Sequence, residues 1–202
     1  MGWRVMAMGR PRGFDPDAVV DAAVKVFWRK GYEGASMADL CAATGLRPGS
    51  VYAAYGSKLG LFSAAVDRYV DTVFAYGMSA LRAPTAAEVV RMWLRGSVDA
   101  ATGDMTPPGC LLVQGALATG EAAAEAQEVL TAKRLAGERV LALRLAEAKV
   151  AGDLPADADP EAIARYVLTV ASGIAVQAAS GVGRAELLAV ADVAAAHLVS
   201  PR

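Results

Sequence analysis

Helix start and stop signals recur at short intervals in the first sixty residues, and they restrict this part of the chain to a series of short helices. The first signal is Asp15-Pro16-Asp17, in which an aspartate caps a helix and a proline occupies its first position. Apolar residues then repeat at the spacing of an amphipathic helix as far as Gly31. A helix is therefore expected over residues 16–31.

Two more short helices are expected next, joined by a tight turn. Ser36 caps a helix over 37–44, and Pro48 begins another that ends near residue 55. Gly45 occupies the turn, where a positive φ is needed, and Cys41 is a small residue at the point where the two helices would touch. The spacing favours a helix-turn-helix, and an ordinary helical hairpin is the alternative.

Composition extends the helical prediction to the whole chain of 202 residues. Hydrophobic residues make up 55%, with much alanine, the best helix former, while aromatic residues make up only 6%. Glycine, proline and aspartate clusters divide the rest of the chain into further expected helices, over residues 58–81, 85–101, 108–119, 121–150, 159–180 and 184–198. The sequence therefore predicts an all-α protein of about nine helices.

Charge is distributed unevenly between the two ends of the chain. Residues 1–60 carry eight Lys or Arg and five Asp or Glu, whereas the remaining residues carry twelve and sixteen. Residues 1–13 hold three Arg with no apolar period and are expected to form a flexible basic arm. A basic head on an acidic body hints at an anionic partner.

Cysteine usage and hydropathy suggest a cytoplasmic protein. Cys41 and Cys110 form neither a CxxC pair nor a metal-ligand spacing, so no metal site and no disulfide are expected. The longest uncharged run, residues 166–183, approaches the length of a membrane span. Its serines, glutamine and glycines favour a buried or subunit-interface helix instead, and no membrane partner is expected.

Three segments of the first sixty residues carry a family resemblance. They are Gly13-Phe14-Asp15, the run GYEGASMADL over 31–40 and the run GLRPGSVYAAYGSK over 45–58. Together they span about fifty residues and resemble the DNA-binding domain of the TetR family of transcriptional regulators. The chain departs from the family pattern at Ala35, where a hydroxyl residue is usual, at Tyr55, where Phe is usual, and at Leu59, where a carboxylate is common.

The resemblance implies a division of the chain into two domains after the arm. Residues 14–58 would form the helix-turn-helix DNA-binding domain, and residues 59–202 a helical bundle that binds a ligand and dimerises. Two heads of a homodimer would enter successive major grooves of double-stranded DNA and read a palindromic operator. The family's closing helices pair between subunits, which places the homodimer interface within residues 159–198.

The residue types around the third helix suit contacts with DNA. Ser36 can donate to a phosphate at a helix N-terminus, with a plain N-cap as the alternative. Arg47 can pair with a guanine edge or a phosphate, and Gly49 would allow close approach. Tyr52 and Lys58 match the family motif. The predicted DNA-binding residues are Ser36, Arg47, Pro48, Gly49, Ser50, Tyr52, Tyr55 and Lys58.

The resemblance also suggests where a small-molecule effector binds. The predicted ligand-binding residues in the body are Met92, Trp93, Cys110, Gln114 and Tyr166. The amide of Gln114 needs a partner in an otherwise apolar helix. Cys110 lies in a GCLLV run similar to one branch of the family, close to an expected helix N-terminus that would lower the pKa of the thiol. A buried, inert thiol is the alternative.

These features predict a ligand-responsive transcriptional regulator, most simply a repressor. A small molecule or modification of the thiol would favour a pose of the two heads that no longer fits the operator. The alternative is a helical enzyme or carrier for a small apolar molecule, although a single histidine and the lack of phosphate-loop, GxSxG and HExxH motifs argue against an enzyme. A third alternative is a dimeric ligand-binding protein whose head binds another protein instead of DNA. No cofactor is expected.

Overall fold

The computed structural model describes residues 14–104, 106–114 and 123–198, and it confirms an all-α fold with no strand in those ranges. The basic arm predicted over 1–13 lies outside them, as do residues 115–119 of the helix predicted over 108–119. The helices are α1 Pro16–Gly34, α2 Met37–Thr44, α3 Pro48–Tyr55, α4 Lys58–Thr72, α5 Ala75–Ala80, α6 Ala86–Thr102, α7 Leu111–Gln114, α8 Ala124–Val150, α9 Pro160–Ala179 and α10 Arg184–Leu198.

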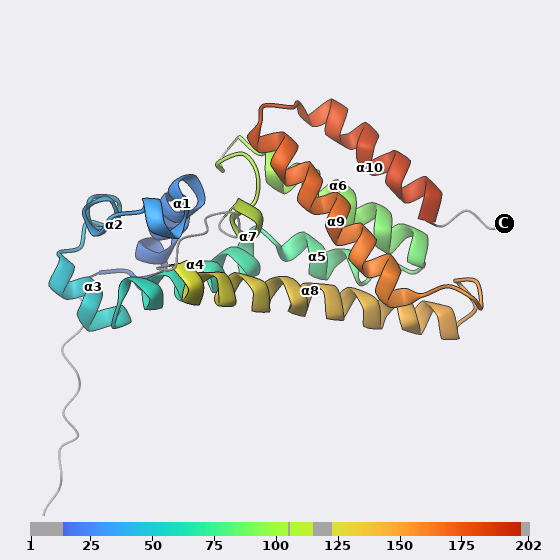
Figure 1. Ribbon diagram of the computed structural model, residues 1–202, viewed down its shortest axis with the longest axis horizontal. Helices are drawn as coiled ribbons and strands as arrows, with labels where there is room; N and C mark the ends of the chain where they lie inside the picture. The colour runs from blue at the N-terminus through green and yellow to red at the C-terminus, as the bar shows by residue number, and fades with distance from the viewer. Residues whose placement is uncertain (1–13, 105, 115–122, 199–202) are drawn as a thin grey trace, which may run out of the picture.

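The helices form an elongated molecule with a small head at one end (Figure 1). Helices α1, α2 and α3 make this head, and α4 leads from it into the body. The 27-residue helix α8 runs along one side of the molecule from beside α4 to the far end. Helices α6, α9 and α10 pack together in the part of the body remote from the head.

Local capping explains the boundaries of the head helices. The carboxylate of Asp15 accepts a hydrogen bond from the N–H of Asp17 at 3.0 Å, and Pro16 occupies the first position of α1. Gly31 has a φ of 68°, so it interrupts α1 at the residue where the sequence predicts its end. Gly45 ends α2 with a φ of 71°, which is the turn geometry that the helix-turn-helix pattern requires.

The prediction of a single helix over residues 58–81 is wrong, because the helix is interrupted between α4 and α5. Two residues that are neither glycine nor proline, Val73 and Phe74, lie at the break. The N–H of Phe74 donates to the carbonyl of Tyr69, five residues back, at 3.1 Å. This wider turn places the ring of Phe74 against Tyr76 and Trp93, at centroid distances of 4.9 and 5.4 Å. Tertiary aromatic packing therefore overrides local helix propensity.

Two hydrophobic cores hold the molecule together. The head core consists of the buried apolar residues between 23 and 69 together with Leu111, Leu112, Ala126 and Leu130. The body core consists of buried residues of α5, α6, α8, α9 and α10 with the loops between them. The head core therefore extends past residue 58 into α7 and the start of α8, so the head and the body share a packed boundary.

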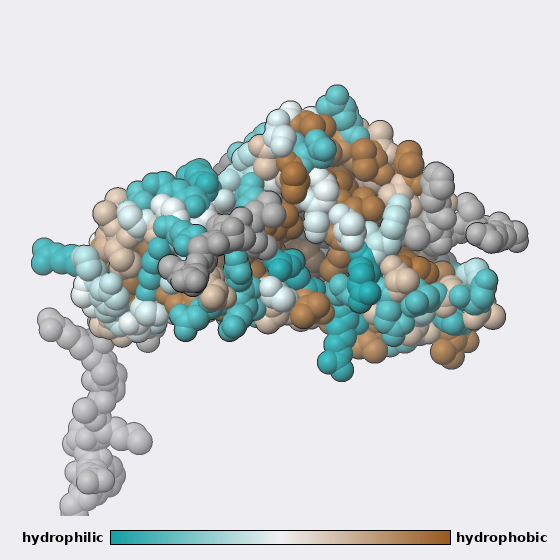
Figure 2. Space-filling model, viewed as in Figure 1, coloured by the Kyte–Doolittle hydropathy of each residue, from teal (hydrophilic) through white to brown (hydrophobic). Residues whose placement is uncertain are grey.

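One apolar face of the body is left uncovered. Helix α9 is long and apolar enough to cross a membrane. Only 28% of its apolar 18-residue stretch is buried in the structure. Its side chains Tyr166 and Val176 are each 43% exposed, and Val190 on the neighbouring α10 is 50% exposed. Figure 2 shows apolar side chains gathered over this part of the surface.

Candidate functional sites

The start of α3 presents a polar, exposed edge at the end of the head. Arg47, Pro48 and Gly49 are exposed, and Tyr52 is 50% exposed one turn further on. Val51, on the opposite side of α3, is fully buried in the head core and anchors the helix. The predicted contacts Ser50 and Tyr55 are half-buried, and Tyr55 packs against the head core.

The hydroxyl of Ser36 acts as the cap of α2 in this structure. It accepts from the N–H of Asp39 at 3.1 Å and lies 2.7 Å from the Oδ2 atom of Asp39. The same Oδ2 atom accepts from the N–H of Ser36 at 3.0 Å, which completes a capping box. Lys30 donates to Asp39 at 2.6 Å, and these bonds hold the pKa of Asp39 well below its usual range, the one from Lys30 most strongly.

Lys58 lies at the N-terminus of α4, over an aromatic ring. Its Nζ atom is 4.5 Å from the centroid of the Tyr32 ring, a cation–π arrangement that fixes the ammonium group near the head surface. Burial lowers the pKa of Lys58, and the nearby Glu33 opposes this shift. The side chain therefore has a defined position beside the turn that follows α3.

Helix α1 is attached to α4 by a two-point ion pair. The Nε atom of Arg68 donates to Oδ1 of Asp21 at 2.7 Å, and its NH2 group donates to Oδ2 at 3.0 Å. The hydrogen bond from Arg68 lowers the pKa of Asp21. Because a bidentate pair fixes orientation as well as distance, a movement of α4 would carry the head with it.

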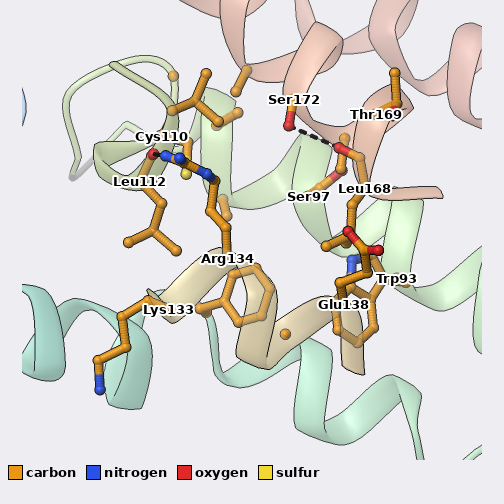
Figure 3. A pocket seen from close by; sticks show the side chains of 18 of the residues that line it. Trp93, Ser97, Cys110, Leu112, Lys133, Arg134, Glu138, Leu168, Thr169 and Ser172 are labelled. Atoms are coloured by element: carbon orange, nitrogen blue, oxygen red, sulfur yellow. Dashed lines mark hydrogen bonds between the residues drawn. The ribbon is translucent and has the colours of Figure 1, made fainter. Parts of the chain in front are cut away.

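A cavity of about 380 Å³ opens in the body beside the boundary with the head. Its inner wall is aromatic, with Tyr69, Phe74, Tyr76 and Trp93 from α4 to α6. Figure 3 shows the facing side chains, which come from α7 and the residue before it, from α8 and from α9. A hollow of this size with a mostly apolar wall suits a small organic molecule.

A chain of contacts joins this cavity to the head. The hydroxyl of Tyr69 donates to the Sγ atom of Cys110 in the cavity wall at 3.1 Å. The ring of Tyr69 packs edge-on against Trp28 of α1 at a centroid distance of 4.9 Å. A change at Cys110 can therefore reach α1 through a single intervening side chain.

The environment of Cys110 raises the pKa of its thiol. Burial is the main cause, and hydrogen bonds from Tyr69 and from the backbone N–H groups of Val113 and Leu112 oppose it in part. The sequence predicts the opposite direction from a helix N-terminus, but α7 has only four residues and its influence does not outweigh burial. The thiol is therefore protonated at neutral pH.

Charged side chains of α8 lie in the cavity wall with partners of their own. Arg134 donates to the carbonyl of Leu112 at 2.8 Å and to the hydroxyl of Thr131 at 2.9 Å, which ties α8 to α7. Glu138 pairs with Arg165 of α9 at 2.9 Å. Arg134 and Glu138 were not predicted from the sequence, because only the packing of α8 brings them to the cavity.

The predicted ligand-binding residues divide into two groups. Trp93 and Cys110 line the cavity, and Tyr69, Phe74 and Tyr76, which were not among the predicted ligand-binding residues, line it as well. Met92 and Tyr166 are 45% and 43% exposed and are not in the cavity wall. Gln114 also lies outside the wall, where its Nε2 donates to the carbonyl of Pro108 at 3.2 Å.

Comparisons with known proteins agree with this architecture. The family described as bacterial regulatory proteins, tetR family, matches residues 19–65, which cover most of the head and the first half of α4. The HTH-type transcriptional repressor ComR of Escherichia coli is 29% identical over 91% of this chain and 88% of its own length. The uncharacterized HTH-type transcriptional regulator YezE of Bacillus subtilis is 32% identical over 79% and 84% of the two chains.

Among solved structures, a cysteine mutant of the TetR family transcriptional regulator CifR is similar throughout. It is 42% identical to this chain, with a TM-score of 0.88, and the match covers 92% of this chain and 98% of the other. That structure is complexed with a 26-base-pair double-strand operator DNA.

Proposed function

Because this chain belongs to the TetR family of transcriptional regulators, we propose that it binds a palindromic operator in the cytoplasm as a homodimer and releases it when a small molecule enters the cavity. Its membership of this family argues against a helical enzyme or carrier. The observation that carries the proposal is the direct contact between the cavity wall and the head through Cys110, Tyr69 and Trp28.

The exposed edge of α3 is the proposed reading surface for DNA. Arg47 can form a bidentate pair with guanine, and Tyr52 and Lys58 can contact the backbone on either side of the helix. Gly49 adds support, since a Cβ atom there would meet nothing within 4 Å and its backbone needs no positive φ. The fold does not require glycine at this position, whereas close approach to a DNA backbone would.

The uncovered face of α9 and α10 is the proposed dimer interface, within residues 159–198. Apolar exposure at Val176 and Val190 fits a helical pairing with a second copy. Gly173 lies on α9, as Val176 does, and there is open space where its Cβ atom would be. This space allows the backbones of the two subunits to approach closely. We expect Val176→Glu to give a monomer in sedimentation, while Val150→Glu, at a 90% exposed position on α8, leaves the dimer intact.

The operator is released when the two heads of the dimer shift from one relative orientation to another. A molecule in the cavity displaces the aromatic wall, and Tyr69 transmits the change to Trp28 and α1. A few kcal/mol of preference for one pose is enough to change operator affinity a hundredfold or more. Modification of the Cys110 thiol would act on the same contact by breaking its bond with Tyr69, but the raised pKa makes that route slow at neutral pH.

Selection of duplexes from a random pool tests the DNA-binding part of the proposal. We expect a palindromic consensus whose affinity falls steeply with salt. Tyr52→Ala should lose at least tenfold in affinity, whereas Tyr55→Phe, which restores the family's usual residue, should bind normally. Enrichment of no sequence at any salt concentration would remove the proposal and favour a head that contacts protein.

A further inference from the structure

One hydrogen-bond donor in the cavity wall has no partner. Trp93 is 1% exposed, and its Nε1 atom is buried without an acceptor in the part of the chain that the structure describes. The benzene edge of its ring lies against α5, where a Cβ on Gly77 would come within 3.3 Å of it. In Figure 3 the nitrogen is on the other edge of the ring, the edge turned toward Leu168 and the carboxyl group of Glu138.

Four hydroxyl groups of the inner wall already have partners. The hydroxyls of Ser97, Ser172 and Thr169 donate to backbone carbonyls within their own helices at 2.7 to 2.8 Å. The hydroxyl of Tyr69 donates to Cys110. Since buried N–H groups are nearly always paired, the indole of Trp93 is the group that a bound molecule is required to satisfy.

The charged groups of the wall are held either by ion pairs or, for Arg134, by hydrogen bonds to neutral groups. Lys133 lies 2.6 Å from Asp67, Glu138 pairs with Arg165, and Arg134 donates to Leu112 and Thr131. A cation would therefore have to break an ion pair to find a counter-charge in the described wall, and an anion would have to compete with two oxygen atoms for the guanidinium group of Arg134. An uncharged molecule meets no such cost, and the aromatic residues offer it apolar contact.

We infer that the effector of this cavity is an uncharged, largely apolar molecule bearing a hydrogen-bond acceptor such as a carbonyl oxygen, and that Trp93 Nε1–H donates to it. The inference rests on the proposed function, because it names the chemistry of the effector whose binding releases the operator. Trp93 then determines specificity, since a molecule of the same shape without an acceptor leaves the buried N–H unpaired.

Matched pairs of probes test the inference on the native full-length protein by titration calorimetry. The pairs are acetophenone with ethylbenzene and benzophenone with diphenylmethane, and each pair differs by one carbonyl group. We expect the ketone of at least one pair to bind about tenfold more tightly, which corresponds to about 1.4 kcal/mol. The ¹⁵N-labelled indole N–H resonance of Trp93 should move downfield with the ketone and much less with the hydrocarbon.

Two variants separate the hydrogen bond from the shape of the cavity. Trp93→Phe removes the donor and keeps an aromatic ring. The ketone and the hydrocarbon should then bind this variant with about equal affinity. Tyr76→Phe removes a different polar group from the same wall and should keep the preference. Binding of the operator without probe reports whether each variant is folded.

The outcomes distinguish the effector's chemistry from the proposed function. Equal affinity within both pairs, no binding of either pair, or a preference that survives in Trp93→Phe would overturn the inference. Tighter binding of the anion 4-phenylbenzoate than of benzophenone would overturn it too. A ketone preference that depends on Trp93, without any change in operator affinity, would uphold the chemistry of the site and refute its role in release.

Discussion

The head core and the body core are built from different kinds of residue. Among the described residues, alanine supplies ten of the twenty-one members of the body core and four of the sixteen in the head core. The head core has fewer alanines and encloses aromatic rings in contact, with Phe27 and Phe62 at a centroid distance of 5.0 Å and Trp28 and Tyr69 at 4.9 Å. The rings of the head core pack mainly against one another, whereas Phe74, Tyr76 and Trp93 of the body line the cavity.

The difference teaches how one chain can be both rigid and responsive. A recognition helix has to keep its geometry to fit a groove, and close aromatic packing provides that. A binding cavity has to accept a molecule, and the space between the aromatic wall and helices α8 and α9 provides that. The two requirements meet at Tyr69, which belongs to the head core and also lines the cavity.

Removing a ring from each region should show the contrast most strongly. Phe27 is fully buried in the head core, so Phe27→Ala should lower the free energy of unfolding by about 3–5 kcal/mol. Phe74→Ala, at the cavity wall, should cost about half as much, because one side of that ring already faces open space. Urea denaturation of both variants measures this, and equal losses would contradict the comparison.

Adding volume should give the same ranking, with the larger loss of stability in the head core. Ala65 is fully buried in the head core, so Ala65→Leu should destabilise the protein by about 1–3 kcal/mol through overpacking. Ala171→Leu points extra methyl groups toward the cavity and should cost less than about 1 kcal/mol. The latter variant should also lose effector binding in calorimetry. A larger cost at Ala171 than at Ala65 would mean that the body is as tightly packed as the head.

Tyr69→Phe probes the contact between the regions. Loss of one hydrogen bond should lower the free energy of unfolding by about 1 kcal/mol. In the native protein the pKa of Cys110 is raised, so its alkylation by iodoacetamide should keep accelerating above the ordinary thiol pKa of about 8.5. The bond from Tyr69 opposes that shift, so the variant's profile should move to still higher pH.

The raised pKa of Cys110 also makes the stability of the protein depend on pH. A thiol whose pKa is higher in the folded state than in the unfolded state contributes fully below the unfolded pKa, and its contribution is lost as the pH rises through the folded pKa. The native protein should therefore lose stability above about pH 8.5, and Cys110→Ala should lose less. An alkylation profile for native protein that levels off near pH 7 would show an activated thiolate instead.

The smallest expected effect is at Gly49. Gly49→Ala should raise the free energy of unfolding by up to about 1 kcal/mol, because the site has space and the unfolded chain loses freedom. The same change should weaken operator binding, since the added methyl group would stand between α3 and the DNA. Circular dichroism melts and operator titration measure the two effects, and unchanged operator affinity would place Gly49 away from the DNA.

The sequence by itself determined the head helices and the family. Caps at Asp15 and Ser36 and the left-handed glycine at Gly45 act over a few residues, so their geometry is written in local sequence. Packing decided the break at Phe74, the raised pKa of Cys110 and the meeting of Trp93, Arg134 and Glu138 around one cavity. These features depend on contacts between residues far apart in the chain, for which no local pattern provides a signal.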